Sequence, residues 1–371
     1  MKIFILFIVS LFLAAYQTKN SETKLKNDTY SFYVGTYTDK ESLGIYKYLL
    51  QQDGSLKQIG LVAKSENPSF LAMSADKRYL LTVNEINKDG VGIVESFLIK
   101  DDTLALINSN SSGGAHPCFI TVNENGFVLV ANYTGGNVGL FRLNKDGELS
   151  SLLDVQTHGG SRIHIDQRVP YVHSAWFEPH DNNIICIDKG TNELWFLQLD
   201  TSLQKLIPSD PQTLEMNSGA GPRHLVIHPN GHWIYVLNEL NNTVTLVQKS
   251  DNGKYIKDES FSTLPIGYTE PSICADIKAS SDGKFIYASN RGHNSIAIFE
   301  VNANNGYLNL VGHQPSLGDA PRNISLSPDE NFLLVANRNS NNIVSFKRDK
   351  ITGLLKMVDQ IGAPTPACIL F

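Results

Sequence analysis

The chain is poor in cysteine and has no block of positive charge. Its 371 residues include 4 cysteines, with no CxxC pair or Cys/His spacing typical of zinc sites. An even number permits disulfides, but each cysteine stands in an apolar, strand-like run. We therefore expect small buried hydrophobic side chains at Cys118, Cys186, Cys274 and Cys368. The net charge of −6, spread along the chain, argues against nucleic acid and anionic membrane surfaces as partners.

The N-terminal apolar run, Ile3–Ala15, is too short for a comfortable membrane span. It follows Lys2, ends in small residues and precedes a polar stretch, as is typical of a secretory signal peptide. We predict a signal peptide over 1–20, a polar linker over 21–29 and an exported protein, periplasmic or secreted. Tyr16 stands where a lipoprotein box needs cysteine, so no stable membrane insertion is expected after cleavage. An uncleaved anchor is the alternative.

Beyond this segment the chain lacks an apolar period of helical length, whereas a strand pattern repeats. Phrases such as PSFLAMSADKRYLLTVN (68–84) and PRHLVIHPNGHWIYVLN (222–238) occur six times, with partial copies at 30–38 and 366–371. Asp-Gly and Asn-Gly turns inside the phrases favour hairpins. Equivalent positions lie 47 to 56 residues apart, close to the spacing of propeller blades, at Gly35, Asn84, Asn132, Asp188, Asn238, Asn290 and Asn337.

Seven such units, each with four short strands, predict an all-β fold over 30–371: a seven-bladed β-propeller of four-stranded blades. The partial copies at the two ends would pair to complete one blade. This pairing closes the ring and removes the exposed strand edges of an open seam. A β-solenoid is the alternative, although its repeats are usually shorter.

Ionisable side chains break the repeat where the first strand of a unit begins and where the second ends. A structural position would carry one residue type, but these positions differ from unit to unit. The two strands are antiparallel and joined by a short turn, so both positions lie at the same end of a blade. They predict a shared site at one channel mouth, with catalytic candidates His173, Arg223, His224, Glu239 and Arg291 and substrate-binding candidates Tyr133, Lys189, Asp276, Arg322 and Asn323. Asp276 has the alternative role of bracing a neighbouring arginine.

Several phrases resemble one family over 30–371: GAGPRHLVIHPNGHWIYVLNELNNTV, VHSAWFEP, SSDGKFIYASNRGHNSIAIFEV and PRNISLSPDENFLLVANRNSNNIVSF. They are similar to the bacterial propeller-type lactonases, which include 6-phosphogluconolactonase and are related to fungal carboxy-muconate lactonizing enzymes. The G-P-R-H and N-E-L pair is the most specific match. The resemblance implies a lactone- or carboxylate-handling site made of His173, Arg223, Glu239 and Arg291.

Two features depart from the family pattern. The insertion GGSRIHIDQRVPY precedes the fourth unit, and we expect it near the mouth, where it can alter specificity. The predicted export separates the chain from phosphogluconolactone, which is a cytosolic pentose-phosphate intermediate. The substrate is therefore expected to be another lactone.

Together these features predict a carboxylic ester hydrolase that opens a sugar lactone. Glu239 or His173, working with His224, would activate water, while Arg223 and Arg291 stabilise the oxyanion or hold a substrate carboxylate or phosphate. The sequence contains no G-x-S-x-G motif, which argues against an acyl-enzyme intermediate. These site residues require no metal or cofactor. Two alternatives stay open: a lactonizing enzyme or cycloisomerase using the same residues, and a non-catalytic ligand-binding propeller at the cell envelope.

Overall fold

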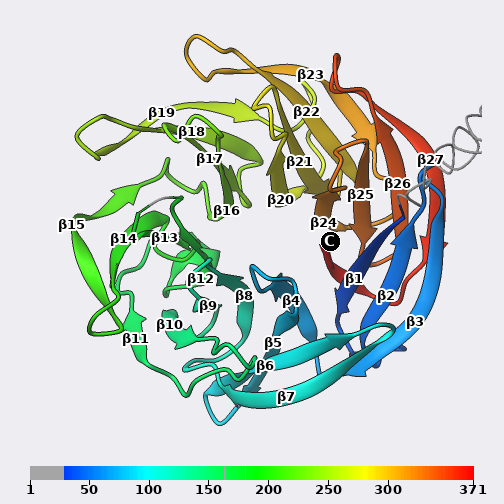
Figure 1. Ribbon diagram of the computed structural model, residues 1–371. Coiled ribbons are helices and arrows are strands. Elements are labelled where there is room, and N and C mark those ends of the chain that lie inside the picture. The colour runs from blue at the N-terminus through cyan, green and yellow to red at the C-terminus, as the bar shows by residue number, and fades with distance from the viewer. Residues whose placement is uncertain (1–28, 163, 180) are drawn as a thin grey trace, which may run out of the picture.

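The computed structural model describes residues 29–162, 164–179 and 181–371. These residues form seven four-stranded antiparallel sheets, arranged as blades around a common axis (Figure 1). The seven-bladed propeller predicted from the sequence is therefore confirmed. The predicted signal peptide and nearly all of the predicted linker lie outside the described residues. No helix within the described ranges is long and apolar enough to cross a bilayer.

Each blade runs from an inner to an outer strand. Blade 1 contains β28 (Pro366–Leu370), β1 (Tyr30–Thr36), β2 (Gly44–Leu50) and β3 (Leu56–Lys64); blade 2 contains β4 (Pro68–Met73), β5 (Tyr79–Lys88), β6 (Val91–Lys100) and β7 (Thr103–Ser111). Blade 3 contains β8 (Pro117–Val122), β9 (Phe127–Asn132), β10 (Asn137–Arg142) and β11 (Asp154–Thr157); blade 4 contains β12 (Val172–Phe177), β13 (Asn183–Asp188), β14 (Glu193–Asp200) and β15 (Lys205–Glu215). Blade 5 contains β16 (Pro222–Ile227), β17 (Trp233–Asn238), β18 (Thr243–Lys249) and β19 (Tyr255–Ser262). Blade 6 contains β20 (Ile273–Ala279), β21 (Phe285–Arg291), β22 (Ser295–Val301) and β23 (Leu308–Pro315); blade 7 contains β24 (Pro321–Leu326), β25 (Phe332–Asn337), β26 (Asn342–Arg348) and β27 (Leu355–Gly362). A short 3-10 helix, η1 (Ile165–Gln167), lies between blades 3 and 4.

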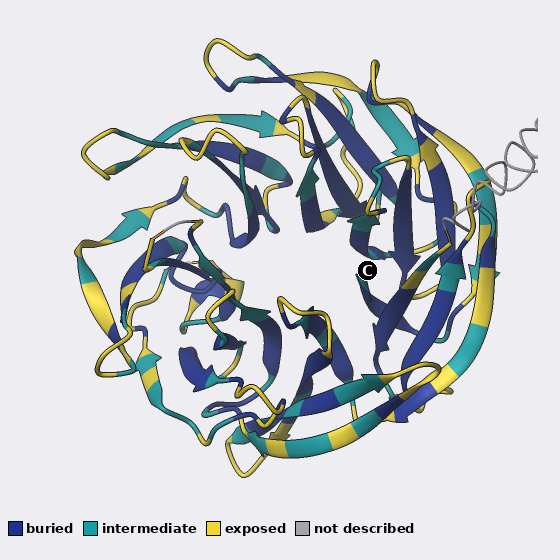
Figure 2. Ribbon diagram, viewed as in Figure 1, coloured by how far each residue is buried: buried dark blue, intermediate teal, exposed yellow. Residues whose placement is uncertain are grey.

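Seven hydrophobic clusters fill the seven interfaces between neighbouring blades. Middle strands are therefore covered on both faces, and every residue of β9 is buried. This explains why the second segment of each unit is a continuous apolar run rather than an alternating one. Exposure is concentrated on the outer strands and connecting loops (Figure 2). The four cysteines are free and buried, as expected.

The last strand closes the ring, as the partial copies predicted. β28 pairs antiparallel with β1, with Val34 opposite Ile369. The inner strand β28 also contacts β4 on one side and β24 on the other. Ile369 is 5% exposed and belongs to the cluster that joins blades 7 and 1. The inner edge of β1 is therefore covered by the C-terminal strand.

A β-bulge interrupts the inner strand of each blade near its start. In blade 5, Pro222 pairs with Asn238 and His224 pairs with Leu237, so Arg223 is an extra residue. A bulge bends its strand and redirects the side chain it carries. The equivalent extra residues in blades 2, 3, 4 and 7 are Ser69, Cys118, His173 and Arg322.

The substitution Ile369→Lys should weaken ring closure, because it places a charge in the buried contact between β28 and its neighbours. Burying such a side chain contributes about 1.5–3 kcal/mol, and an unpaired buried charge adds a further cost. We expect the free energy of unfolding, measured by urea denaturation, to fall by at least about 3 kcal/mol. Met357→Lys on β27, where Met357 is 40% exposed, is the control and should change it by less than about 0.5 kcal/mol. Equal losses from both variants would contradict this role for β28.

Candidate active site in the channel mouth

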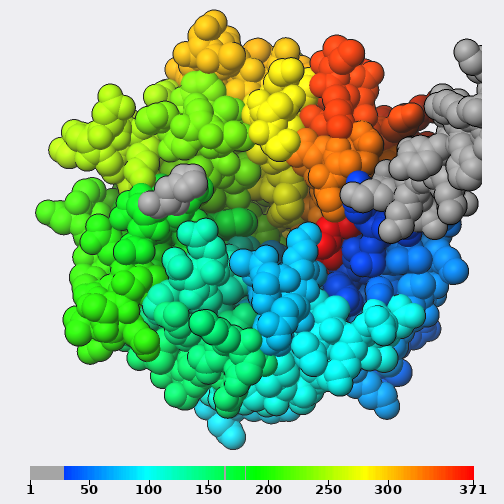
Figure 3. All heavy atoms as spheres, viewed as in Figure 1, coloured from blue at the N-terminus to red at the C-terminus, as the bar shows by residue number. Residues whose placement is uncertain are grey.

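A pocket of about 280 Å³ opens where the second strands of the blades end. In the space-filling view this face of the molecule is hollowed at its centre, between the blades (Figure 3). All seven blades contribute to the pocket, whose lining residues are Tyr37, Glu85, Cys118, Tyr133, His173, Arg223, Glu239, Arg291, Arg322 and Arg338.

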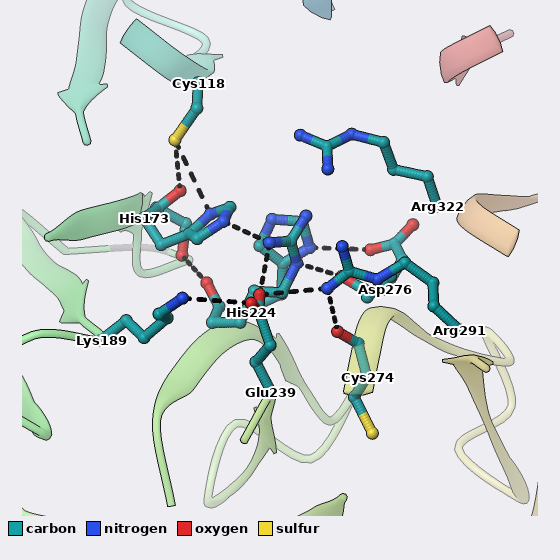
Figure 4. A network of polar contacts seen from close by, with 12 residues as sticks. Cys118, His173, Lys189, His224, Glu239, Cys274, Asp276, Arg291 and Arg322 are labelled. Carbon is teal, nitrogen blue, oxygen red and sulfur yellow. Dashed lines mark hydrogen bonds and ion pairs between the residues drawn. The ribbon is translucent and has the colours of Figure 1, made fainter. Parts of the chain in front are cut away.

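The carboxylate of Glu239 lies at the centre of a cationic cluster (Figure 4). Its Oε1 accepts a hydrogen bond of 3.1 Å from Lys189 Nζ. Its Oε2 accepts one of 2.6 Å from Arg223 Nη1 and lies 3.2 Å from Arg291 Nη2. Blades 4, 5 and 6 thus each supply one cation to a single carboxylate. Residues that break the repeat in three different blades thus lie together at one place.

Burial and charge act in opposite directions on Glu239. Burial disfavours the ionised carboxyl, but Arg223, Arg291 and Lys189 outweigh burial and hold the pKa of Glu239 well below its ordinary value. Burial and the neighbouring Arg223 lower the pKa of Arg291 to about 10. At neutral pH the cluster therefore consists of one carboxylate and three cations.

His173 is the bulge residue of β12, and its Nε2 faces Arg223 Nη1. A guanidinium only donates hydrogen bonds, so we assign Nε2 as the acceptor and place the ring proton on Nδ1. Burial, reinforced by Arg223, lowers the pKa of His173 well below its ordinary value. His173 is thus a neutral imidazole beside the Glu239 carboxylate at neutral pH.

His224, Asp276 and Asn323 form a second polar layer deeper in the channel. His224 Nδ1 lies 3.0 Å from Asp276 Oδ1, and Asp276 Oδ2 accepts a hydrogen bond of 2.7 Å from Asn323 Nδ2. The side-chain oxygen Oδ1 of Asn323 in turn accepts one of 2.8 Å from the Ile369 backbone N–H. None of the three lines the pocket, although His224 is predicted to be catalytic and the other two to bind substrate. The geometry therefore favours a positioning role for all three over direct contact with a substrate.

The remaining predicted residues lie at or beside the pocket. Arg322 and Tyr133 line it. The Tyr133 ring stands edge-on to His173, with centroids 5.2 Å apart. Lys189 lies behind Glu239, with Nζ 5.5 Å from the centre of the Tyr133 ring.

Four lining residues were missed as site candidates: Tyr37, Glu85, Cys118 and Arg338. Cys118 occupies the same bulge position as Arg223, and Glu85 and Arg338 occupy the position of Glu239 in their blades. Tyr37 was missed because Gly35 was taken as the equivalent of Asn238. In the structure Thr36, not Gly35, pairs with Pro366, the first residue of the inner strand. The residue equivalent to Glu239 in blade 1 is therefore Tyr37.

The pocket has an excess of positive charge in an acidic protein. Four arginines and two glutamates line it, whereas the whole chain carries a net charge of −6. Such a local excess attracts anions and polarises carbonyl groups. Within the described ranges, no three His, Cys, Asp or Glu side chains are grouped so as to hold a metal ion.

Comparison with known proteins gives the same family as the sequence motifs. A family model described as "Lactonase, 7-bladed beta-propeller" matches residues 31–371. The chain belongs to this lactonase family. The 6-phosphogluconolactonase of Bacillus subtilis (strain 168) is 34% identical over 348 residues, which is 92% of this chain and 98% of that protein. The 6-phosphogluconolactonase of Formosa agariphila is 35% identical over 306 residues, covering 79% and 85%. The structure of the Pseudomonas aeruginosa periplasmic gluconolactonase PpgL is 28% identical, with a TM-score of 0.87 and coverage of 92% and 98%.

In this lactonase-family chain, the insertion between blades 3 and 4 lies against the loop that carries Lys189. Gln167 Nε2 donates hydrogen bonds of 2.8 Å to the Lys189 carbonyl oxygen and 3.0 Å to Asn192 Oδ1. Arg162 donates a hydrogen bond of 2.8 Å to Glu193, on β14. The expected position near the mouth is confirmed, and the insertion supports a residue that pairs with Glu239.

The lactonase fold should lose stability in acid through His224. Burial lowers the pKa of His224 from 6.5 to about 4, so below pH 6.5 the unfolded chain binds a proton that the folded chain does not. The free energy of unfolding therefore falls by about 3 kcal/mol as the pH drops from 6.5, the pKa of His224 in the unfolded chain, to about 4, its pKa in the folded protein. Urea denaturation at several pH values should show a shallower pH dependence for His224→Asn than for the parent. His232→Asn, at an exposed turn, should keep the parent's dependence; the same flattening in both variants would contradict the assignment.

Proposed function

We propose that this pocket hydrolyses the ring of a sugar lactone. The observation that carries the proposal is the ionised Glu239, held by three cations beside a neutral His173 in an open pocket. General-base activation of water and stabilisation of an oxyanion are the two requirements of lactone opening. Relatives named for gluconolactone and phosphogluconolactone hydrolysis support the same reaction class.

The base arm consists of His173 and Glu239. A water placed against the lactone carbonyl carbon gives a proton to His173 Nε2 or to a Glu239 oxygen as its oxygen attacks. Both groups are held by Arg223 in the free protein, so a substrate oxygen that draws the Arg223 N–H groups away makes them better acceptors. The ring C–O bond then breaks, which turns the lactone into a hydroxy acid.

The electrostatic arm consists of Arg223 and Arg291. As water attacks, the carbonyl oxygen becomes an oxyanion, and guanidinium N–H groups are suitable donors to it. Arg223 is fixed by a hydrogen bond of 2.7 Å from its Nε to the Ala275 carbonyl oxygen, and Arg291 by one of 2.7 Å to the Cys274 carbonyl oxygen. These backbone anchors hold both cations in place before the substrate arrives, so little reorganisation is needed during the reaction.

The substrate class follows from the charge of the pocket. With Arg322 and Arg338 added to the cluster, a lactone bearing a carboxylate or phosphate is favoured over an uncharged one. We infer that the protein is exported, because its N-terminal sequence fits a signal peptide and a relative of 28% identity is described as periplasmic. An exported enzyme would meet a lactone other than the cytosolic phosphorylated intermediate.

Ring opening should be measured on D-glucono-δ-lactone, its phosphorylated form and a uronic-acid lactone, with spontaneous hydrolysis subtracted. Glu239→Gln removes the central carboxylate, so we expect kcat/KM to fall by about 10²-fold or more. Glu178→Gln is the matched control, because Glu178 is also buried and ion-paired, to Lys249 at 2.6 Å, but lies outside the pocket. A native protein that opens none of these lactones would favour a ligand-binding propeller, and equal losses in the two variants would refute the assignment of Glu239.

The pH profile should reveal a base that stays deprotonated in mild acid. The pKa of His173 lies well below 6.5, and that of Glu239 well below 4.5. Whichever acts, the active form persists as the pH falls, so kcat/KM should stay level from about pH 8 to below 6.5 before it declines. Stopped-flow assays across this range measure it. An inflection at or above pH 6.5 would point to an ordinary histidine base and contradict the assignment.

A further inference from the structure

A second polar cluster, made of Tyr37, Glu85, Arg322 and Arg338, lines the same pocket. The Tyr37 hydroxyl donates a hydrogen bond of 2.7 Å to Glu85 Oε2 and accepts one from Arg322 Nη2. The guanidinium carbon of Arg338 lies 4.0 Å from the centre of the Tyr37 ring, and that of Arg322 lies 5.0 Å from it. One phenol is thus flanked by two cations and a carboxylate.

The two clusters face each other across the pocket. His173, Arg223 and Arg291 come from blades 4, 5 and 6, whereas the Tyr37 cluster comes from blades 7, 1 and 2. In a ring of seven, blade 1 lies three steps from blade 4 in one direction and three from blade 5 in the other. Figure 4 shows Arg322 apart from the hydrogen-bonded network around Glu239. A substrate in the pocket therefore touches the base arm on one side and Tyr37 on the other.

Lactone opening needs a proton at the ring oxygen as well as a base for water. When the C–O bond breaks, the ring oxygen takes the bonding electron pair and becomes an alkoxide, which is a poor leaving group unless it is protonated. Burial lowers the pKa of Arg322, but Tyr37 and Glu85 raise it above its ordinary value, so the arginine bonded to Tyr37 keeps its proton. Tyr133, the other phenol in the pocket, lies against His173 on the base side. Tyr37 is the neutral O–H group among the lining residues opposite the base arm.

We propose that Tyr37 is the general acid of the ring opening, an inference that rests on the proposed lactonase function. Its hydroxyl turns from Glu85 to the ring oxygen and gives its proton as the C–O bond breaks. The O–H electron pair stays on Tyr37 as a phenolate, which Arg322 and Arg338 stabilise. The proton that the base arm took from water returns to this phenolate through solvent, so the cycle leaves the enzyme unchanged.

The surroundings of Tyr37 suit this role. Burial, assisted by Glu85 and opposed by Arg322, raises the pKa of Tyr37 above its ordinary value, so it keeps its proton at neutral pH. A raised pKa also makes Tyr37 a weaker acid, so it gives its proton only to a strong base such as the departing alkoxide. The acid and the base thus remain in different protonation states at the same pH.

The test compares two leaving groups in Tyr37→Phe, which removes the hydroxyl and keeps the ring under Arg338. On D-glucono-δ-lactone, whose leaving group is an alkoxide, kcat should fall by about 10²-fold or more. On dihydrocoumarin, whose leaving group is a phenolate that needs no protonation, kcat should fall by less than about 5-fold. A general acid produces this difference, whereas a residue that only shapes the pocket lowers both rates alike.

Tyr287→Phe is the matched control. The Tyr287 hydroxyl is also buried, accepts a hydrogen bond of 2.9 Å from Arg348 Nε and donates one of 2.9 Å to the Gly353 carbonyl oxygen. Arg348 is paired with Glu330 at 3.3 Å, so the same three residue types meet outside the pocket. Both rates should stay at the parent level in this variant.

The outcomes separate the two proposals. Equal losses on both lactones in Tyr37→Phe would overturn the role of Tyr37 while leaving the lactonase function standing. If the parent does not open dihydrocoumarin, the kcat and KM of Tyr37→Phe on D-glucono-δ-lactone decide. A lower kcat at similar KM supports Tyr37 as the general acid, and a change confined to KM overturns this role. A parent that opens no lactone overturns both proposals.

Discussion

The ion cluster around Glu239 is the interaction on which the pocket depends. Burying a carboxylate away from water is costly, and burying three cations close together is costly as well. Here each cost is offset by the other, because Lys189, Arg223 and Arg291 surround one carboxylate. Since these cations come from three blades, the cluster also fixes the positions of those blades relative to one another at the channel. Removing Glu239 leaves three buried cations without a counter-charge, whereas removing one cation leaves the carboxylate still paired. The cluster therefore depends most on Glu239.

The β-bulges allow a repeated backbone to hold a site that does not repeat. Middle strands and interface clusters require similar apolar residues in every blade, which leaves little room for chemistry there. The extra residue of each inner strand is free of this requirement, because it pairs with nothing on the neighbouring strand. Ser69, Cys118, His173, Arg223 and Arg322 occupy this position in five blades. Variation at a few such positions changes the pocket without changing the core.

The sequence predicted the architecture, the ring closure and the residues around Glu239, because turn signals, period and motif all agree on them. It did not predict depth along the channel. Arg223 and His224 are neighbours in the chain, yet Arg223 lines the pocket and His224 lies deeper. The cause is the bulge at Arg223, and the alternation of apolar and polar residues along the strand gives no sign of a bulge. Tyr37 was missed because its unit is split between the two ends of the chain, so its alignment had no first strand to fix it. Cys118 was predicted to be a core residue because the residues on both sides of it are apolar. Apolar neighbours do not show that a bulge turns the Cys118 side chain toward the channel.

The ring closure has a consequence for when the pocket is completed. Tyr37 stands just after β1, and its backbone N–H donates a hydrogen bond of 3.2 Å to the Thr365 carbonyl oxygen, while Thr365 Oγ1 donates one back to the Tyr37 carbonyl oxygen. The position of Tyr37, near the start of the propeller sequence, thus depends on contacts with Thr365, near its end. Glu239 and its three cations, by contrast, all come from residues 189–291 in the middle of the chain. A chain that stops before Thr365 therefore lacks the contacts that hold Tyr37 opposite the cation cluster.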